Sequence, residues 1–357
     1  MPNKILQFFD EKFIIKLLKE RVLPQYPAFA SVKKVKIIPH KKLVWESTYH
    51  VVLEFKTTFL TSRGKKKILS IFSTAHSTEP RKNVYYGLKF LWKNNFSKGF
   101  LTIPHALFYS NFYKATFYRG VNGHNLYYFI GEKNFKVIEE ILPKTAGWFA
   151  KLHSIPTKDA KNFNKKNSRV KTVVPGVENI LKKISDKYPR YQELSKKIYE
   201  IIIKEEEKFF SSTGRRWLVH GDAHPENVIK MGKKKIAVID FTDLCLADFA
   251  RDIGSFLQQL EYMCNKKIGD PEYSLKAKKI FLDNYFRNAK IKMNDDLEKR
   301  INNYYNWTMM RTATSLLLQH NPRPDHAEPL LKQISKNLNI THNLQPITHG
   351  QRDKHEL

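Results

Sequence analysis

One segment, residues 217–256, constrains the fold of this chain more than any other, because it sets three polar side chains around a short hairpin. Asp222 precedes Asn227 by five residues, and Asp240 follows a further apolar stretch. The alternation of apolar and turn residues predicts strands at residues 217–219, 228–229 and 236–239, with a turn at residues 231–233. Since a hairpin returns the chain by its own length, we expect Asn227 and Asp240 to lie close together.

These side chains suit metal-assisted phosphate chemistry. Mg²⁺ prefers oxygen ligands and keeps several waters, so the amide of Asn227, the carboxylate of Asp240 and the phosphates of a nucleotide form a suitable ligand set. Asp222 lies outside this set and is placed to orient a substrate hydroxyl and to accept its proton. The segment therefore predicts a site for Mg²⁺ and a nucleoside triphosphate, with Asp222 as the base.

The motif HGDAHPEN followed by VIDF resembles the catalytic segment of the aminoglycoside phosphotransferase and choline kinase group, which is related to the protein kinases. His220, Asp222, Asn227 and Asp240 occupy the motif positions, and Asp252 matches a later Asp of the group. The resemblance implies an α+β, two-lobed protein-kinase-like fold, with a small antiparallel β-sheet N-terminal lobe and a mainly helical C-terminal lobe. It also implies a kinase that transfers the γ-phosphoryl group of ATP or GTP to a hydroxyl of a small, amine-bearing acceptor.

Several of these residues also have a structural interpretation. Asp252 is as well suited to cap a helix over residues 253–263 as to take part in chemistry. We group His220 with Asp222 in the catalytic set, although a buried histidine fits a support of the loop better than a proton carrier. His224 has no assigned role. A metallophosphoesterase is disfavoured, since that class needs a further D-x-H upstream of this motif and a G-N-H downstream of it, and neither is present.

Length and composition limit the class of protein that this chain can be. With 357 residues, 41% of them hydrophobic and 13% aromatic, the chain is large enough for a folded protein of two lobes. No apolar run approaches the length of a membrane span, and the first residues carry charges, so we expect a cytoplasmic protein. The two cysteines, Cys245 and Cys264, lack metal-ligand spacing and are expected to be reduced.

The formal net charge is +29, from 63 Lys and Arg against 34 Asp and Glu. Such a charge attracts nucleic acid and other polyanions. The excess is spread along the chain, however, and the abundance of Lys, Asn, Ile, Phe and Tyr is typical of a genome rich in A and T. We favour this compositional explanation over a nucleic-acid partner, and keep a pseudokinase or polyanion-binding protein with the same fold as the alternative function.

The first third of the chain has the pattern of a kinase small lobe. Apolar residues four apart predict an amphipathic helix over residues 5–18. Strands are predicted at residues 35–38, 48–55, 68–74, 106–109 and 115–118, and a helix at residues 83–92. We place the N-terminal lobe at residues 1–118, the catalytic and acceptor-binding lobe at residues 119–340, and a polar tail at residues 341–357.

The third predicted strand departs from what the resemblance implies. Protein-kinase-like enzymes carry a Lys there for the nucleotide phosphates and a Glu in the next helix to pair with it. The strand ILSIFSTAH has no Lys and the helix VYYGLKFLW has no Glu. Arg81, Lys82 and the lysines at residues 65–67 are candidates for the missing charge. No G-x-G-x-x-G loop is present, so polar residues within 40–47 would have to cover the phosphates.

The C-terminal lobe begins with a predicted hinge. Residues 117–126 resemble the family segment that reads adenine, with Tyr118, Arg119 and Gly120 as the predicted contacts and an ordinary glycine turn as the alternative. Helical spacing follows at residues 135–153, 177–186, 190–210, 253–263, 274–288, 295–320 and 327–338. Acidic residues of the late helices are candidates to bind an amine: Glu261, Asp283, Asp295, Asp296, Asp325 and Glu328. Aromatic residues there are candidates for cation–π contacts with a quaternary ammonium: Tyr262, Tyr304, Tyr305 and Trp307.

Overall fold

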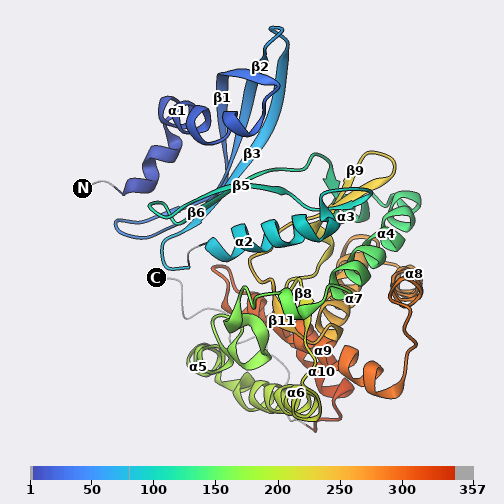
Figure 1. Ribbon diagram of the computed structural model, residues 1–357. Coiled ribbons are helices and arrows are strands. Elements are labelled where there is room, and N and C mark those ends of the chain that lie inside the picture. The colour runs from blue at the N-terminus through green and yellow to red at the C-terminus, as the bar shows by residue number, and fades with distance from the viewer. Residues whose placement is uncertain (1–2, 80, 342–357) are drawn as a thin grey trace.

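The computed structural model describes residues 3–79 and 81–341 and shows a β-rich N-terminal lobe and a helical C-terminal lobe (Figure 1). The predicted α+β architecture of two lobes, with an antiparallel sheet in the first and mainly helices in the second, is therefore confirmed. The exact boundary between residues 118 and 119 stays a prediction. Residues 342–357 of the predicted polar tail lie outside the described residues.

A five-stranded antiparallel sheet forms the N-terminal lobe, in the order β1-β2-β3-β6-β5. Its strands are β1 Phe29–Val44, β2 Tyr49–Thr61, β3 Lys66–His76, β5 His105–Ser110 and β6 Ala115–Arg119. Buried and more exposed residues alternate along most of β2, because one face of the sheet packs on the core. Val51, Leu53 and Phe55 are fully buried on that face. Every strand predicted for this lobe is present, and each extends beyond its predicted length.

The N-terminal helix is not the single element that the sequence predicts. A 3₁₀ helix, η1 Lys4–Phe9, ends at Asp10, and α1 Glu11–Arg21 starts after it. The carboxylate of Asp10 accepts hydrogen bonds from the backbone N–H groups of Lys12 and Phe13, so it caps the new helix. Because the helix restarts at Glu11, the positions that face the core differ from those of one continuous helix. The buried residues are Ile5, Phe8, Ile14 and Leu18, rather than the predicted set of residues 5, 9, 13 and 17.

A smaller sheet carries the predicted hairpin. Its order is β4-β10-β9-β7, with β4 Leu101–Thr102, β7 His124–Asn125, β9 Val228–Met231 and β10 Lys235–Val238. β9 pairs antiparallel with β10, and Val228 faces Val238 at the open end of the hairpin. A separate pair joins β8 Trp217–Val219 to β11 Cys245–Ala247. The hairpin and β8 lie where the sequence predicts them.

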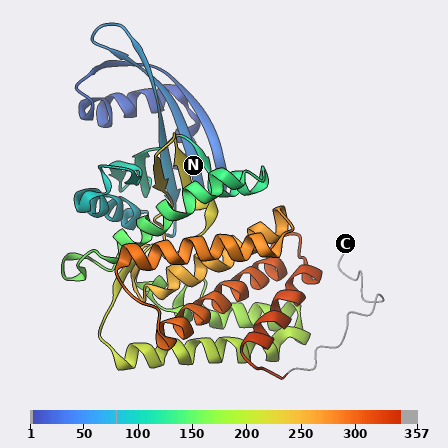
Figure 2. The same ribbon diagram turned by 90° about the vertical axis from the view of Figure 1, so that its right-hand side faces the viewer.

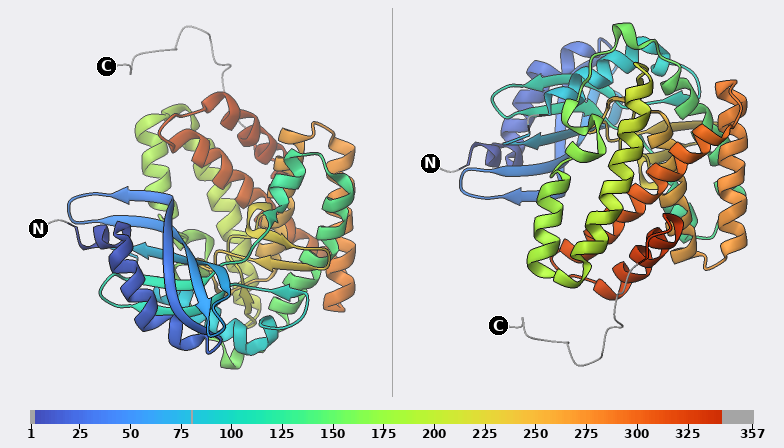
Figure 3. Two further views of the ribbon diagram at one scale, coloured as in Figure 1. Left: turned by 90° about the horizontal axis from the view of Figure 1, so that it is seen from above. Right: turned by 90° about the horizontal axis from the view of Figure 1, so that it is seen from below.

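The C-terminal lobe consists mainly of helices, which Figure 2 shows stacked below the N-terminal sheet. They are α3 Leu126–Gly131, α4 Phe135–His153, α5 Val177–Lys187, α6 Gln192–Ser212, α7 Ala250–Lys267, α8 Pro271–Ala289, α9 Asp295–Leu318 and α10 Pro324–Asn337. Seen from below, α5 and α6 cover the underside of the lobe (Figure 3). Each long helix agrees with its predicted range to within a few residues.

Two hydrophobic cores stabilise the two lobes. One joins η1 and α1 to the large sheet, and the other fills the C-terminal lobe. The helix that follows β3, α2 Lys82–Leu91, contributes Val84, Leu88 and Leu91 to the second core. This helix therefore packs against the C-terminal lobe, although it lies within the residues predicted for the N-terminal lobe. It forms part of the interface between the two lobes.

Candidate active site

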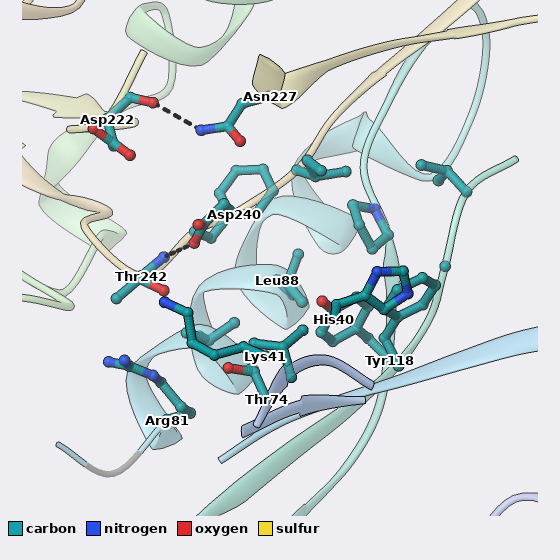
Figure 4. Close-up of a pocket in the computed structure, with 18 of the residues that line it drawn as sticks. His40, Lys41, Thr74, Arg81, Leu88, Tyr118, Asp222, Asn227, Asp240 and Thr242 are labelled. Atoms are coloured by element: carbon teal, nitrogen blue, oxygen red, sulfur yellow. Dashed lines mark hydrogen bonds between the residues drawn. The ribbon is translucent and has the colours of Figure 1, made fainter. Parts of the chain in front are cut away.

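A cavity of about 580 Å³ opens between the lobes, and both lobes line it. The N-terminal lobe contributes side chains of β1, β2 and β3, and the C-terminal lobe contributes the loop after β8 and the end of the β9–β10 hairpin. Asp222, Asn227 and Asp240 all face this cavity (Figure 4). The three residues on which the sequence-based hypothesis depends thus lie in one site.

The hairpin brings Asn227 and Asp240 together as predicted. The backbone N–H of Ile239 donates to the carbonyl of Asn227 at 2.9 Å, which closes the hairpin next to both residues. Asp240 has a φ of 61°, in the left-handed region, and its carboxylate accepts the backbone N–H of Thr242 at 3.3 Å. Asp tolerates this conformation better than most residues, and strained backbone of this kind gathers at functional sites.

The amide of Asn227 has a defined orientation. Its Nδ2 donates to the carbonyl of Asp222 at 3.0 Å and lies 3.0 Å from His224 Nε2. This leaves the amide oxygen turned toward the cavity, as Figure 4 shows. An amide oxygen and a carboxylate are ligands that Mg²⁺ accepts. Within residues 3–79 and 81–341, no group of three or more His, Cys, Asp or Glu could hold a metal ion, so Mg²⁺ here would need nucleotide oxygens to complete its ligand set.

The loop that carries Asp222 turns sharply at Gly221. Its φ is 85°, and a Cβ at this position would lie 2.3 Å from the carbonyl oxygen of Asp243, so the loop requires glycine here. The backbone N–H groups of His220 and Gly221 donate to the two carboxylate oxygens of Asp252, at 2.7 and 2.9 Å. The loop is therefore fixed by a carboxylate from a different element, the first turn of α7.

The sequence suggests that Asp252 caps its own helix, but the structure shows no such cap. α7 begins at Ala250 without a side-chain cap, and Asp252 is only 1% exposed. Burial raises the pKa of Asp252, but the hydrogen bond from His153 Nε2 and the backbone donors outweigh it and hold the pKa below its ordinary value. Asp252 is thus a buried carboxylate that positions the catalytic loop.

His220 also acts as a support. Its side chain is fully buried, its Nε2 donates to the carbonyl of Ile239 at 2.9 Å, and its Nδ1 faces the backbone N–H of Asp222 at 3.4 Å. Both ring nitrogens are thus engaged with backbone groups. The ring ties the loop to the end of β10, which is the structural interpretation that the sequence favours for this residue.

Asp222 is half-buried between two basic side chains that the sequence analysis did not assign. Nε2 of His224 lies 3.4 Å from one carboxylate oxygen, and Arg311 of α9 lies 3.5 Å from the other. Burial raises the pKa of Asp222, but the hydrogen bond from His224 and the charge of Arg311 outweigh it, so its pKa stays well below the ordinary range. The carboxylate is therefore ionised at neutral pH, as a group that orients a hydroxyl must be.

Two arginines, Arg311 and Arg251, contribute to the site without a signal in the local sequence. Arg311 stacks over Trp307, with its guanidinium carbon 5.0 Å from the ring centre. Arg251, buried in the first turn of α7, donates to the carbonyl of Gly221 at 2.9 Å. Arg311 lies 89 positions from Asp222 along the chain, so only the tertiary fold reveals the contact.

Two of the three predicted hinge residues line the cavity and the third does not. Tyr118 and Gly120 line the cavity, whereas Arg119 is not among its lining residues and lies near Tyr26 in the N-terminal lobe. The backbone N–H of Gly120 donates to the carbonyl of Ser70 at 2.9 Å, so it is not available to a nucleotide. Among the candidates for the missing phosphate-binding charge, Arg81 lines the cavity and Lys82 does not.

The fold and the site together define a phosphotransferase with a protein-kinase-like architecture. Residues 52–272, more than half of the chain, match the phosphotransferase enzyme family, and the chain belongs to that family. The predicted enzyme class, a phosphotransferase, is thereby confirmed. No curated protein matches the chain.

Several solved structures share the fold. The ethanolamine kinase of Plasmodium vivax is 15% identical, with a TM-score of 0.54, and the match covers 93% of this chain and 91% of that one. Aminoglycoside-3'-phosphotransferase of type VIII is 14% identical, with a TM-score of 0.51 and coverage of 82% and 97%. Wild-type aminoglycoside 2'-phosphotransferase-IIIa, solved with GDP, is 13% identical, with a TM-score of 0.52 and coverage of 90% and 99%. At these identities the likeness shows the fold alone.

No helix within the described ranges is long and apolar enough to span a membrane.

We expect Asp252→Asn to lower the free energy of unfolding by roughly 3 kcal/mol and to reduce turnover, because two buried N–H groups and His153 lose a charged acceptor. Urea unfolding monitored by tryptophan fluorescence measures the first effect. Asp295→Asn is the matched control: Asp295 also lies in the first turn of a helix but is exposed, so the change should stay within about 0.5 kcal/mol. Equal effects of the two substitutions would show that Asp252 supports only its own helix.

Proposed function

We propose that this chain transfers the γ-phosphoryl group of ATP or GTP to a hydroxyl of a small molecule, with Asp222 as the base and with Asn227 and Asp240 as ligands of Mg²⁺. The observation that supports this most directly is the convergence of these three residues on one cavity between the lobes. They come from a loop and from the two arms of a hairpin, each fixed by its own hydrogen bonds.

Each of these residues has a different role in the proposed reaction. Asp222 is ionised and half-exposed, so it orients the acceptor hydroxyl and receives its proton as the oxygen attacks phosphorus. Arg311 lies beside Asp222 and holds it in its charged form. The oxygens of Asn227 and Asp240 would hold Mg²⁺ against the phosphates. When bound, the ion neutralises part of the charge on the triphosphate.

The identity of the acceptor stays open, and the predicted amine stays a prediction. The acidic residues proposed to bind it are not among the residues that line the cavity with Asp222. Most of them pair with basic side chains elsewhere: Glu261 with Lys278, Asp283 with Lys279, Asp296 with Arg300, and Glu328 with Lys332. The carboxylates that the sequence suggested for an amine are therefore engaged away from the base.

A second cavity, of about 310 Å³, is lined by Arg311, the residue whose guanidinium also lies 3.5 Å from Asp222. It lies between α5, α6 and α9, and most of its lining is apolar or aromatic, including Val173, Ile180 and Trp307. Arg311 and Lys183 are its charged lining residues, and no carboxylate of the described residues lines it. This lining favours an acceptor with an apolar part and without a strong positive charge.

The base assignment predicts the effect of Asp222→Asn. Phosphoryl transfer should fall by at least about 100-fold, because general-base catalysis contributes that much or more. Binding of the Mg²⁺–nucleotide complex, measured by thermal shift, should stay close to that of the wild type. Asp186→Asn, at an exposed position of α5, serves as the control and should leave both quantities unchanged. Wild-type turnover in Asp222→Asn would refute the assignment.

The metal assignment predicts a loss of Mg²⁺ dependence in Asp240→Asn. Asn tolerates the left-handed backbone of this position, so the substitution removes the charge with little change of conformation. Isothermal titration of ATP with Mg²⁺ and with EDTA should show tighter binding with the metal in the wild type, and little difference in the variant. An undiminished Mg²⁺ effect in the variant would place the metal elsewhere.

An acceptor screen tests the function itself. ATP and GTP consumption would be followed with choline, ethanolamine, amino sugars and aminoglycosides, and with uncharged and anionic alcohols of similar size. The lining of the second cavity predicts the highest kcat/KM among the alcohols without a cationic group. The highest value for an amine would restore the amine prediction.

The alternative function is a pseudokinase or nucleic-acid-binding protein that keeps the fold. It predicts no thermal shift with Mg²⁺ and either nucleotide, together with tight, strongly salt-dependent binding of RNA. The cavity with an ionised Asp222 favours the enzyme.

A further inference from the structure

The strand that should carry the phosphate-binding lysine presents Thr74 to the cavity instead. Thr74 of β3 pairs with Val52 of β2, and Val52 pairs with Lys41 of β1. Residues opposite one another on neighbouring strands lie on the same face of a sheet. All three therefore point into the cavity, and Lys41 brings a positive charge to the wall from which the β3 lysine is absent.

A β-bulge aims Lys41 at the cavity. The register of β1 against β2 shifts between Pro39 and Lys41, so His40 is an extra residue in the pairing. As a result, His40 and Lys41 both line the cavity although they are consecutive. In Figure 4 the amine of Lys41 extends toward Asp240 and Thr242. No carboxylate forms an ion pair with Lys41 in the part of the chain that the structure describes.

Arg81 supplies a second cation at the same end of the cavity. It immediately precedes α2 and is only 6% exposed, and its Nε has no hydrogen-bond partner among the described residues. Its ion pair is with Glu79, at 3.2 Å, and the Glu79 side chain is 48% exposed. A buried guanidinium is costly unless its donors are satisfied, so this geometry is one that a bound anion would complete.

The two cations already affect the groups around them. Burial and the charges of Lys41 and Arg81 lower the pKa of His50 to about 4. The pKa of His76 is also lowered, by burial and then by Arg81, and Glu79 opposes this effect. Both histidines are therefore neutral at pH 7. Glu79 is the only described carboxylate that forms an ion pair with either cation, so the end of the cavity near Lys41 and Arg81 keeps an excess of positive charge.

We propose that Lys41 and Arg81 together bind the phosphates of the nucleotide, in place of a lysine on β3. The proposal rests on the proposed function, since it identifies which residues hold the phosphates of the co-substrate. It also accounts for the absence of Glu from α2, because neither Lys41 nor Arg81 requires a partner from that helix. The other candidates lie elsewhere: the amine of Lys82 is over the ring of Tyr86, and residues 65–67 do not line the cavity.

The test compares Lys41→Met and Arg81→Met with Lys42→Met, and measures the affinity for ATP, ADP and adenosine by calorimetry. Lys42 is the matched control, because it is the next residue of β1 and its amine lies over the ring of Phe9, 4.9 Å from the ring centre. We expect Lys41→Met and Arg81→Met each to weaken ATP binding by at least about 10-fold, since each loses charge-assisted hydrogen bonds to phosphate. Adenosine binding should change little, and Lys42→Met should bind all three ligands as the wild type does.

The outcomes separate this inference from the proposed function. If the wild type prefers ATP to adenosine and Lys41→Met and Arg81→Met keep that preference, the phosphate-binding charge lies elsewhere and this inference alone is wrong. If the wild type binds neither ATP nor GTP, the proposed function fails and the inference fails with it. Lys41 is exposed and unpaired among the described residues, so its variant provides the test even if Arg81→Met does not fold.

Discussion

The carboxylate of Asp252 is the group on which the geometry of the site depends. It accepts the N–H groups of His220 and Gly221 and the Nε2 proton of His153, all within the protein interior. A buried charge is stable only with such donors, and the N–H groups of a sharp turn are stable only with an acceptor. Arg251, from the same helical turn, holds the carbonyl of Gly221. Both polar backbone groups of Gly221 are thus held by α7, and the helix determines where Asp222 points.

The hairpin provides the second constraint, and it acts independently of α7. It closes at Asn227 and Ile239, and the chain then enters the left-handed region at Asp240. The amide of Asn227 donates to the carbonyl of Asp222, which links the hairpin to the loop. Asp222, Asn227 and Asp240 are thus held in one arrangement by hydrogen bonds that involve the backbone rather than by contacts among their own charged atoms. The amide oxygen of Asn227 and the carboxylate of Asp240 both face the cavity.

The parts of the fold that depend on neighbouring residues were predictable from the sequence, and the parts that depend on distant ones were not. The HGD motif, the hairpin and the long helices are local patterns. Arg311 reaches the site from a distant helix, and nothing in its own surroundings marks it. Lys41 falls within residues 40–47, which the sequence suggested as a cover for the phosphates, but the direction of its side chain depends on the β-bulge of β1. Strands of two residues, such as β4 and β7, are too short to show a period. The break at Asp10 did have a local signal, because an Asp just before an apolar run is a typical helix cap.

The cavity has walls of opposite charge, and this division limits what can bind there. Asp222, Asp240 and Asp243 lie on the side of the C-terminal lobe, and Lys41 and Arg81 lie on the side of the N-terminal lobe. Burial and then the charge of Asp222 raise the pKa of Asp243, so the acidic wall already carries a cost in repulsion. An anion that bound this wall alone would add to the repulsion, whereas a triphosphate with a divalent cation would meet each wall with the opposite charge. The net charge of +29 cannot replace this arrangement, because charges on the outer surface are screened beyond about 8 to 10 Å in salt. The unusual composition of the chain and the cations of the cavity are therefore separate properties, and the proposed function depends only on the second.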